Sequence, residues 1–149
     1  MDAITMLKAD HDKVKKLLTE LESTTERGVK TREELFATIK GELSIHEVIE
    51  EEIFYPALKS HPKAKDIVLE GYEEHHIADV IVRELHQVAT DDEQWGAKFK
   101  VLKESIEHHI KEEEGEMFRT ARGVLSREEL KTLGAKMIAM KERPIVSRG

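Results

Sequence analysis

The chain has 149 residues, enough for a single domain that buries a core without cross-links. It contains no cysteine, which excludes disulfides, catalytic thiolates and iron–sulfur clusters. Acidic residues outnumber basic ones by 31 to 24, the net charge is −7, and the basic residues form no stripe, so we expect no nucleic-acid partner. No apolar run is long enough to span a membrane, and the charged N-terminal segment lacks the apolar core of a signal peptide. We therefore expect a cytoplasmic protein with no membrane partner.

Apolar residues recur at spacings of three and four along nearly the whole chain, and alternating strand-like patterns are absent. The sequence therefore predicts an all-α protein. Thr31, Thr90 and Ser126 are each followed three residues later by glutamate, which is the pattern of a capping box at a helix start. Pro56 is expected to end or kink the second helix. In chain order, the predicted helices cover residues 3–27, 32–55, 63–89, 91–121 and 127–142.

Short connections join the first four predicted helices, and short connections favour antiparallel neighbours. We expect an up-down-up-down four-helix bundle over residues 1–122. Residues 123–149 would belong to the same domain as a C-terminal packing helix and a loose tail, the tail running from Arg143 to Gly149. The fifth helix would pack outside the bundle through one apolar face, formed by Leu130, Leu133, Met137 and Ile138.

A two-helix repeat separates inward-facing histidines from exposed ones. From His11, apolar residues follow at offsets of 3, 6, 7 and 10 in the first helix. The same offsets from His75 in the third helix also fall on apolar residues, whereas those from His76 fall on Asp79, Arg83 and another histidine. The pattern therefore predicts that His75 is the equivalent of His11 and that His76 is exposed.

The second and fourth helices repeat in the same way. Each has a run of apolar residues followed by histidine, by glutamate four residues later, and by another apolar residue; the two pairs are His46 with Glu50, and His109 with Glu113. Starting instead from His108 gives a polar face. Residues four apart lie one above the other on a helix, so each pair points its imidazole and carboxylate at one place.

Six polar side chains on core-facing stripes need a shared partner, because an unpaired buried carboxylate or imidazole is strongly disfavoured. A pair of divalent cations would supply that partner, and bridging glutamates are an established arrangement in helical bundles. The ligand types suit iron, manganese and zinc. We favour iron, because six protein ligands shared between two ions leave coordination positions for oxygen-derived ligands. The predicted metal ligands are His11, His46, Glu50, His75, His109 and Glu113.

The chain resembles the hemerythrin-like, or HHE cation-binding, domain family. The matching segments are LKADH at residues 7–11, HEVIEEEIFYP at 46–56, EEH at 73–75 and HIKEEEGEMF at 109–118. The resemblance implies a four-helix bundle that holds two non-haem irons with an oxo or hydroxo bridge, bound by the same six residues. It also implies a small diatomic or peroxide ligand, because members of the family bind or sense dioxygen, nitric oxide, iron or peroxide.

One departure from the family bears on function. Oxygen-carrying hemerythrins use five histidines, two of them about one turn apart on the third helix. Here Tyr72 and Asp79 lie about one turn from His75, and the fifth histidine is missing. Tyr72, Asp79, Glu47 or water could take the vacant place, and Tyr72 is favoured as a packing residue.

We expect storage, sensing or detoxification of dioxygen, nitric oxide or peroxide, with a peroxide-consuming, catalase-like activity as the enzymatic version. The alternative is a non-catalytic, iron-responsive module whose metal occupancy controls its stability and its contact with an unidentified protein.

Overall fold

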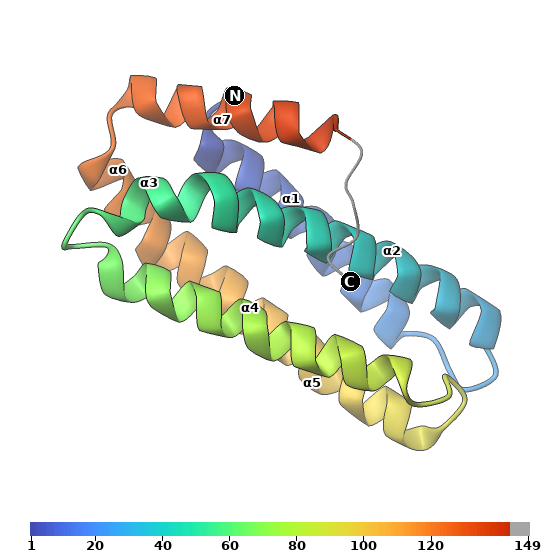
Figure 1. Ribbon diagram of the computed structural model, residues 1–149. Helices are drawn as coiled ribbons and strands as arrows, with labels where there is room; N and C mark the ends of the chain where they lie inside the picture. Colours follow the sequence, from blue (N-terminus) through green and yellow to red (C-terminus); the bar gives the residue numbers. More distant parts are fainter. Residues whose placement is uncertain (144–149) are drawn as a thin grey trace.

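The computed structural model describes residues 1–143 and contains only helices and their connections over that range, which confirms the predicted all-α class. The α-helices are α1 (Ala3–Glu22), α2 (Val29–Ile49), α3 (Tyr55–Lys59), α4 (Lys65–His86), α5 (Glu93–Glu112), α6 (Phe118–Val124) and α7 (Arg127–Lys141). Two π-helical turns, η1 (Glu50–Phe54) and η2 (Glu113–Met117), join α2 to α3 and α5 to α6 without a break. The long helices α1, α2, α4 and α5 form the predicted up-down-up-down bundle (Figure 1). Within residues 1–143, no helix combines the length and the hydropathy needed to cross a bilayer.

Some helix boundaries differ from those predicted. α1 ends at Glu22, because the hydroxyls of Ser23 and Thr24 donate to carbonyls of its last turn. Of the three expected capping boxes, only that of Ser126 and Glu129 forms, at the start of α7. α2 begins after Gly28, and α5 is capped by Asp92, so Thr31 and Thr90 are not caps.

Pro56 does not end the second helical segment. It lies in the first turn of α3, directly after η1, where the N–H that proline lacks is not required for a helical hydrogen bond. The helical path therefore continues from Val29 to Lys59.

The core is divided into two apolar clusters along the bundle axis. One cluster contains residues from the start of α1, both π turns and α7, including Leu7, Phe54 and Phe118. The other lies toward the α4–α5 connection and includes Leu18, Trp95 and Phe99. On α1, α2 and α4 a predicted histidine lies between residues of the two clusters, as His11 does between Leu7 and Val14. On α5, His109 lies among residues of the second cluster, and Met117 of the first cluster follows in η2. A polar layer thus separates two apolar halves of one core.

α7 packs outside the bundle against α1, α2 and η1 (Figure 1). Leu130, Leu133 and Met137 are buried as predicted, but Ile138 is 40% exposed, so its assignment to the packing face is wrong. A further contact is made by Gly134, which lies against the backbone of the N-terminus. Apart from Arg143, the predicted loose tail lies outside the described residues.

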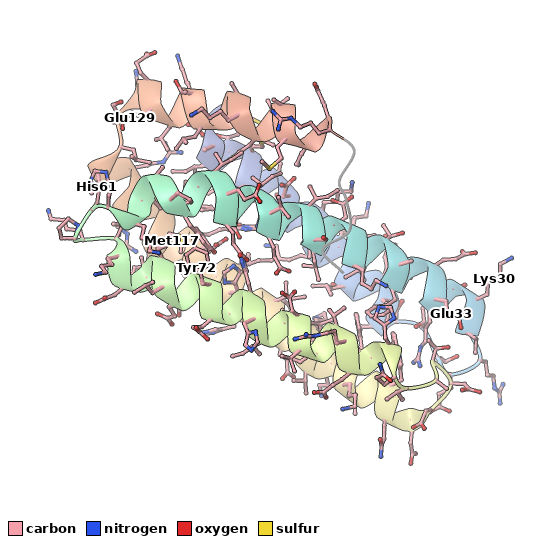
Figure 2. All side chains as sticks on the ribbon, in the orientation of Figure 1. Lys30, Glu33, His61, Tyr72, Met117 and Glu129 are labelled. Carbon is pink, nitrogen blue, oxygen red and sulfur yellow. The ribbon has the colours of Figure 1, made fainter. Side chains whose placement is uncertain are left out.

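The labelled side chains in Figure 2 locate the two ends of the bundle. Figure 2 shows His61 in the α3–α4 loop at the end where Glu129 begins α7, while Lys30 and Glu33 mark the opposite end. Tyr72 and Met117 lie between these ends. His61 therefore lies away from the central polar layer.

Candidate metal centre

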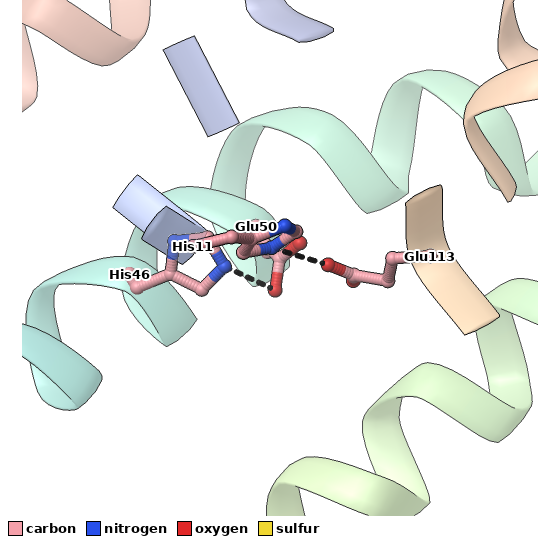
Figure 3. A group of neighbouring side chains, drawn as sticks. All are labelled: His11, His46, Glu50 and Glu113. Atoms are coloured by element: carbon pink, nitrogen blue, oxygen red, sulfur yellow. Dashed lines mark hydrogen bonds and ion pairs between the residues drawn. The ribbon is translucent and has the colours of Figure 1, made fainter. Parts of the chain in front are cut away.

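The structure brings the six predicted side chains together in the polar layer. Each of them is at most 8% exposed, whereas the neighbouring His76 and His108 are exposed. Their ligand atoms form two groups in which all atoms lie within 4.8 Å of one another. His11 and His46 form one group with both glutamates, and His75 and His109 form the other with the same two glutamates. Figure 3 shows the first group, with imidazoles and carboxylates pointing at a common point.

Each glutamate spans the two halves of the repeat. Glu50 Oε1 lies 3.2 Å from His46 Nε2 and 2.9 Å from His75 Nε2. Glu113 divides its oxygens, with Oε1 at 3.1 Å from His11 Nε2 and Oε2 at 3.1 Å from His109 Nε2. A carboxylate that faces one histidine from each half has the placement required of a ligand that bridges two cations.

Three buried atoms in the layer lack hydrogen bonds among the described residues. They are His46 Nε2, His109 Nε2 and Glu50 Oε2. The two nitrogens are close to carboxylate oxygens, but those contacts lack the direction of a hydrogen bond. Buried polar atoms are normally satisfied, so three of them facing one small volume fit a site shaped to hold cations.

Each of the four clustered histidines has a second carboxylate on its outer side, facing its Nδ1 atom. The Nδ1-to-carboxylate distances are 2.7 Å for His11 and Glu114, 3.4 Å for His46 and Asp10, 2.8 Å for His75 and Glu51, and 2.6 Å for His109 and Glu74. An Nδ1–H that donates to a carboxylate leaves Nε2 free to bind a metal and fixes the ring orientation. All four histidines therefore present the same nitrogen inward.

The ligand set predicted from the sequence included none of these outer carboxylates. The signal was their position in the repeat. Asp10 and Glu74 each directly precede the histidine on the first helix of their half of the repeat. Glu51 and Glu114 each directly follow a predicted bridging glutamate.

Contacts between acids and imidazoles shift the pKa values of the cluster. Burial alone would lower the pKa of His46, but the charge of Glu50 and the hydrogen bond to Asp10 outweigh it and raise that pKa to about 10. Burial likewise opposes the charged form of His75, and its bonds to Glu50 and Glu51 raise its pKa to about 9. The neighbouring imidazoles outweigh burial at Glu50 and hold its pKa well below 4.5. Without a cation, protons on the histidines thus occupy the role that metal charge would take.

Both π turns begin at a predicted bridging glutamate. The backbone N–H of Tyr55 donates to the carbonyl of Glu50, and that of Phe118 donates to the carbonyl of Glu113. A π turn places residues five apart one above the other, whereas an α-helix would turn the fifth residue away. The turns therefore direct Tyr55 and Phe118 into the core directly beyond the polar layer, where both are buried.

A small cavity borders the histidines on the side away from Tyr55. Its volume is about 30 Å³, enough for one or two molecules the size of water. The four imidazoles and the carboxylates Glu47 and Glu74 form part of its wall. The rest is mainly apolar, formed by Val14, Leu43, Ala78, Ile106 and Ile110.

Comparison with known protein families shows to which family this chain belongs. The sequence profile of the hemerythrin HHE cation-binding domain matches residues 2–121, which covers the whole four-helix bundle and all six clustered residues. The chain belongs to the hemerythrin HHE family. Membership in this family implies cation binding, and the buried histidine and glutamate cluster is the candidate site.

Two individual proteins are similar to this hemerythrin. The crystal structure of an HHE cation-binding domain-containing protein from Mycobacterium kansasii superposes with a TM-score of 0.85 at 27% identity, covering 95% of this chain and 86% of that one. A protein named DNA nickase, from a Nostoc species, is 24% identical over 143 residues, which is 96% of this chain. The hemerythrin chain spans only 40% of the nickase.

The hydroxyl of Tyr55 reaches the layer from its apolar side. It donates to Glu113 Oε2 at 2.5 Å and lies 3.4 Å from both Glu50 Oε1 and His75 Nε2. Burial and the charges of Glu50 and Glu113 raise its pKa well above 10, so the phenol is neutral in the absence of a cation. Tyr55 is thus a functional candidate that sequence reasoning placed only at a helix end.

Gly71 makes room for this hydroxyl. It lies one turn before His75, and a Cβ at this position would come within 2.7 Å of the Tyr55 hydroxyl oxygen. Gly71 is a further position about one turn from His75, in addition to Tyr72 and Asp79. Tyr55 therefore occupies the space that a side chain at residue 71 would enter.

The groups expected to replace the fifth histidine lie elsewhere. The Tyr72 hydroxyl donates to the backbone carbonyl of Glu51 at 3.5 Å, and its ring packs on Tyr55. Asp79 is exposed. Glu47 is buried but groups with Glu51 and His75, and so lies on the outer side of His75. Burial, opposed by His75 and assisted by Asp79, raises the pKa of Glu47 to about 8.

Proposed function

We propose that this hemerythrin holds two non-haem irons, one between His11 and His46 and one between His75 and His109. Glu50 and Glu113 would bridge them. The observation that carries the proposal is that each glutamate faces one histidine from each half of the repeat. Iron in such a centre supplies redox-active binding positions for dioxygen, nitric oxide and peroxide.

The protein donors are divided unequally between the two positions. Tyr55 lies near His75 and near both bridging carboxylates, so it adds a fifth oxygen or nitrogen donor to the His75–His109 position. The His11–His46 position has four donors. We infer that a small exogenous ligand binds on the His11–His46 side, where fewer protein groups compete with it.

The cavity beside the imidazoles supports the size and polarity of this ligand. Its volume of about 30 Å³ fits a diatomic molecule or a peroxide but no larger substrate. Its wall is mainly apolar, while the imidazoles, Glu47 and Glu74 supply polar atoms. We therefore propose storage, sensing or detoxification of dioxygen, nitric oxide or peroxide, in which detoxification would convert two peroxides into two waters and one dioxygen.

Elemental analysis and optical spectroscopy of the native protein test the proposal directly. We expect about two irons per chain, a spectral response to dioxygen or nitric oxide, and consumption of added hydrogen peroxide. An iron-loaded protein that shows no spectral response and consumes no peroxide would contradict the proposed function.

Two adjacent histidines on α4 give a matched test of the ligand assignment. His75→Ala removes a buried imidazole that faces Glu50, whereas His76→Ala removes an exposed one on the same helix. We expect His75→Ala to lower bound iron from about two per chain toward one, and His76→Ala to leave it unchanged. Iron content that falls only in the His76 variant would show that the wrong member of the pair was assigned to the centre.

A further inference from the structure

The C-terminal helix is connected to the metal centre through two consecutive side-chain contacts. Lys141, at the end of α7, forms an ion pair with Asp10 Oδ1. The other oxygen of Asp10 faces His46 Nδ1 at 3.4 Å. Asp10 is only 9% exposed, so its carboxylate has little access to water and depends on these two partners.

The seating of α7 on α1 fixes where Lys141 lies. A Cβ at Gly134 would clash with the carbonyl oxygen of Met1 and approach the backbone of Ala3, so the two helices touch there without an intervening side chain. Lys141 follows Gly134 by seven residues, and Asp10 follows Ala3 by seven. Seven residues are two helical turns, so both contacts lie on the same face of each helix. The glycine contact therefore aligns the lysine with Asp10.

The second half of the repeat has no such lysine. Glu74, the equivalent of Asp10, holds His109 Nδ1 at 2.6 Å, and its other charged neighbour is the mostly exposed His108 at 3.7 Å. The Asp10–His46 contact is the longest of the four outer contacts, the other three being 2.6 to 2.8 Å. At 3.4 Å, His46 holds the Asp10 carboxylate weakly, and Lys141 supplies the closer partner.

We propose that Lys141 is a positioning residue that keeps Asp10 against His46, so that retention of the metal between His11 and His46 depends on the docking of α7. This inference rests on the proposed metal centre. Without Lys141, the buried Asp10 carboxylate loses its main partner and turns toward water. The His46 ring then loses the contact that orients its Nε2 toward the metal position.

Iron release from the full-length protein tests this. The wild type and variants are loaded with Fe(II) without oxygen and challenged with excess 2,2′-bipyridine, whose Fe(II) complex is coloured. In Lys141→Met we expect one of the two irons to leave about tenfold faster than either iron of the wild type, and the other to leave at the wild-type rate. Lys136→Met, which changes an exposed lysine of the same helix, is the matched control and should behave as the wild type.

Two further variants separate positioning from general loosening of the bundle. Lys141→Arg keeps the ion pair and should restore slow release. In an Asp10→Asn background, Lys141→Met should add little, because the lysine acts through the carboxylate. Wild-type rates in Lys141→Met, equal acceleration of both irons, or additive effects in the double variant would each overturn the inference. A wild-type protein that binds no iron would instead contradict the proposed function.

Discussion

Tyr55 is the residue at which the two halves of the metal centre differ most. Its repeat equivalent is Phe118, and the two rings stack on His75 and His11 respectively, at centroid distances of 5.4 Å and 5.8 Å. Only Tyr55 carries a hydroxyl, and the residue four before its stacking partner His75 is Gly71, whereas the residue four before His11 is Leu7. The hydroxyl and the space for it therefore both lie on the His75 side of the metal centre.

Tyr55→Phe should change the electronic properties of the centre without removing iron. The Phe118 side shows that a phenyl ring fits this place in the fold, and a nearby ferric ion reverses the local charge and favours a phenolate. We expect wild-type Fe(III) protein to show a visible tyrosinate charge-transfer band that Tyr55→Phe lacks, with iron content unchanged. Tyr72→Phe is the control, because that hydroxyl contacts only a backbone carbonyl among the described residues. Identical visible spectra for wild type and Tyr55→Phe would show that Tyr55 is not a ligand.

Gly71→Ala should reproduce part of the Tyr55→Phe phenotype by displacing the hydroxyl. The added methyl group would lie 2.7 Å from the hydroxyl oxygen and 2.9 Å from the ring carbon that bears it. Gly41→Ala is the matched control, because a Cβ there meets nothing within 4 Å and also lies inside a helix. We expect Gly71→Ala to be less stable than Gly41→Ala by about 1–3 kcal/mol in denaturant unfolding. Equal stabilities would show that Tyr55 adjusts freely.

The inward histidines were predictable because their neighbours in sequence obey the helical period. His75 and His109 have apolar residues at core offsets, while the adjacent His76 and His108 do not. Tyr55 was not predictable by that reasoning, because α-helical spacing from Glu50 leads to Phe54 and turns the next residue outward. The clue was the paired aromatic or apolar residues at the same place in both repeats, Phe54–Tyr55 and Met117–Phe118.

At the scale of elements, the π turns explain why the second and fourth predicted helices had the wrong internal register. η1 and η2 each place one extra residue in a turn, immediately after a predicted bridging glutamate. A residue inserted there changes no polarity pattern upstream, so the sign of it is the adjacent pair of aromatic or apolar residues in each repeat, Phe54–Tyr55 and Met117–Phe118. Both turns are π-helical at equivalent places, which associates them with the centre rather than with a local packing defect.

α7 begins with a capping box, and the contribution of this box to the stability of the protein can be measured. The Ser126 side chain accepts from the backbone of Glu129, whose carboxylate accepts from the backbone N–H of Ser126. Ser126→Ala should cost about 1 kcal/mol, and so lower the Tm by roughly 2–4 °C. Thr132→Ala, at an exposed position of the same helix, should shift stability by no more than about 0.5 kcal/mol. A Tm shift in Thr132→Ala as large as that in Ser126→Ala would argue against the cap.

At the scale of the whole molecule, metal binding and folding are linked, because the ligands come from four separate helices. A metal at about 1,000 times its Kd adds roughly 4 kcal/mol to the folded state, which for this chain length raises the Tm by roughly 8–16 °C. Scanning calorimetry with iron and with a chelator measures the difference. Coincident transitions would exclude the alternative role as an iron-responsive module whose stability follows metal occupancy.

The Tm difference between the iron-loaded and the metal-free protein should depend on pH. In the metal-free fold the pKa values of His46 and His75 are raised from 6.5 to about 10 and about 9, so their stabilising effect is complete below pH 6.5 and is lost as pH rises toward 9 and 10. The pKa of Glu50 is lowered from 4.5, so its contribution is complete above pH 4.5 and is lost in acid. We expect the metal-free protein to be most stable between about pH 4.5 and 6.5.

Metal binding must expel the histidine protons, so iron affinity should rise with pH across the same upper range. The Tm difference between iron-loaded and metal-free protein is therefore expected to widen from pH 6 to pH 9. Calorimetric titration in buffers of different ionisation enthalpy gives the number of protons released per iron. A Tm difference that stays constant over this range would show that the imidazoles are neutral before the metal binds.

The exchange of partners between the two halves has an evolutionary consequence. Glu50 of the first half faces His75 of the second, and Glu113 of the second faces His11 of the first, so one helical hairpin alone has no complete site. Two identical hairpins associated by two-fold symmetry could form one, but every substitution would then appear twice. Joining the copies in a single gene removes that constraint. Divergence of position 55 from position 118 is a change that only a fused duplicate can make, and it lets one chain specialise its two metals separately.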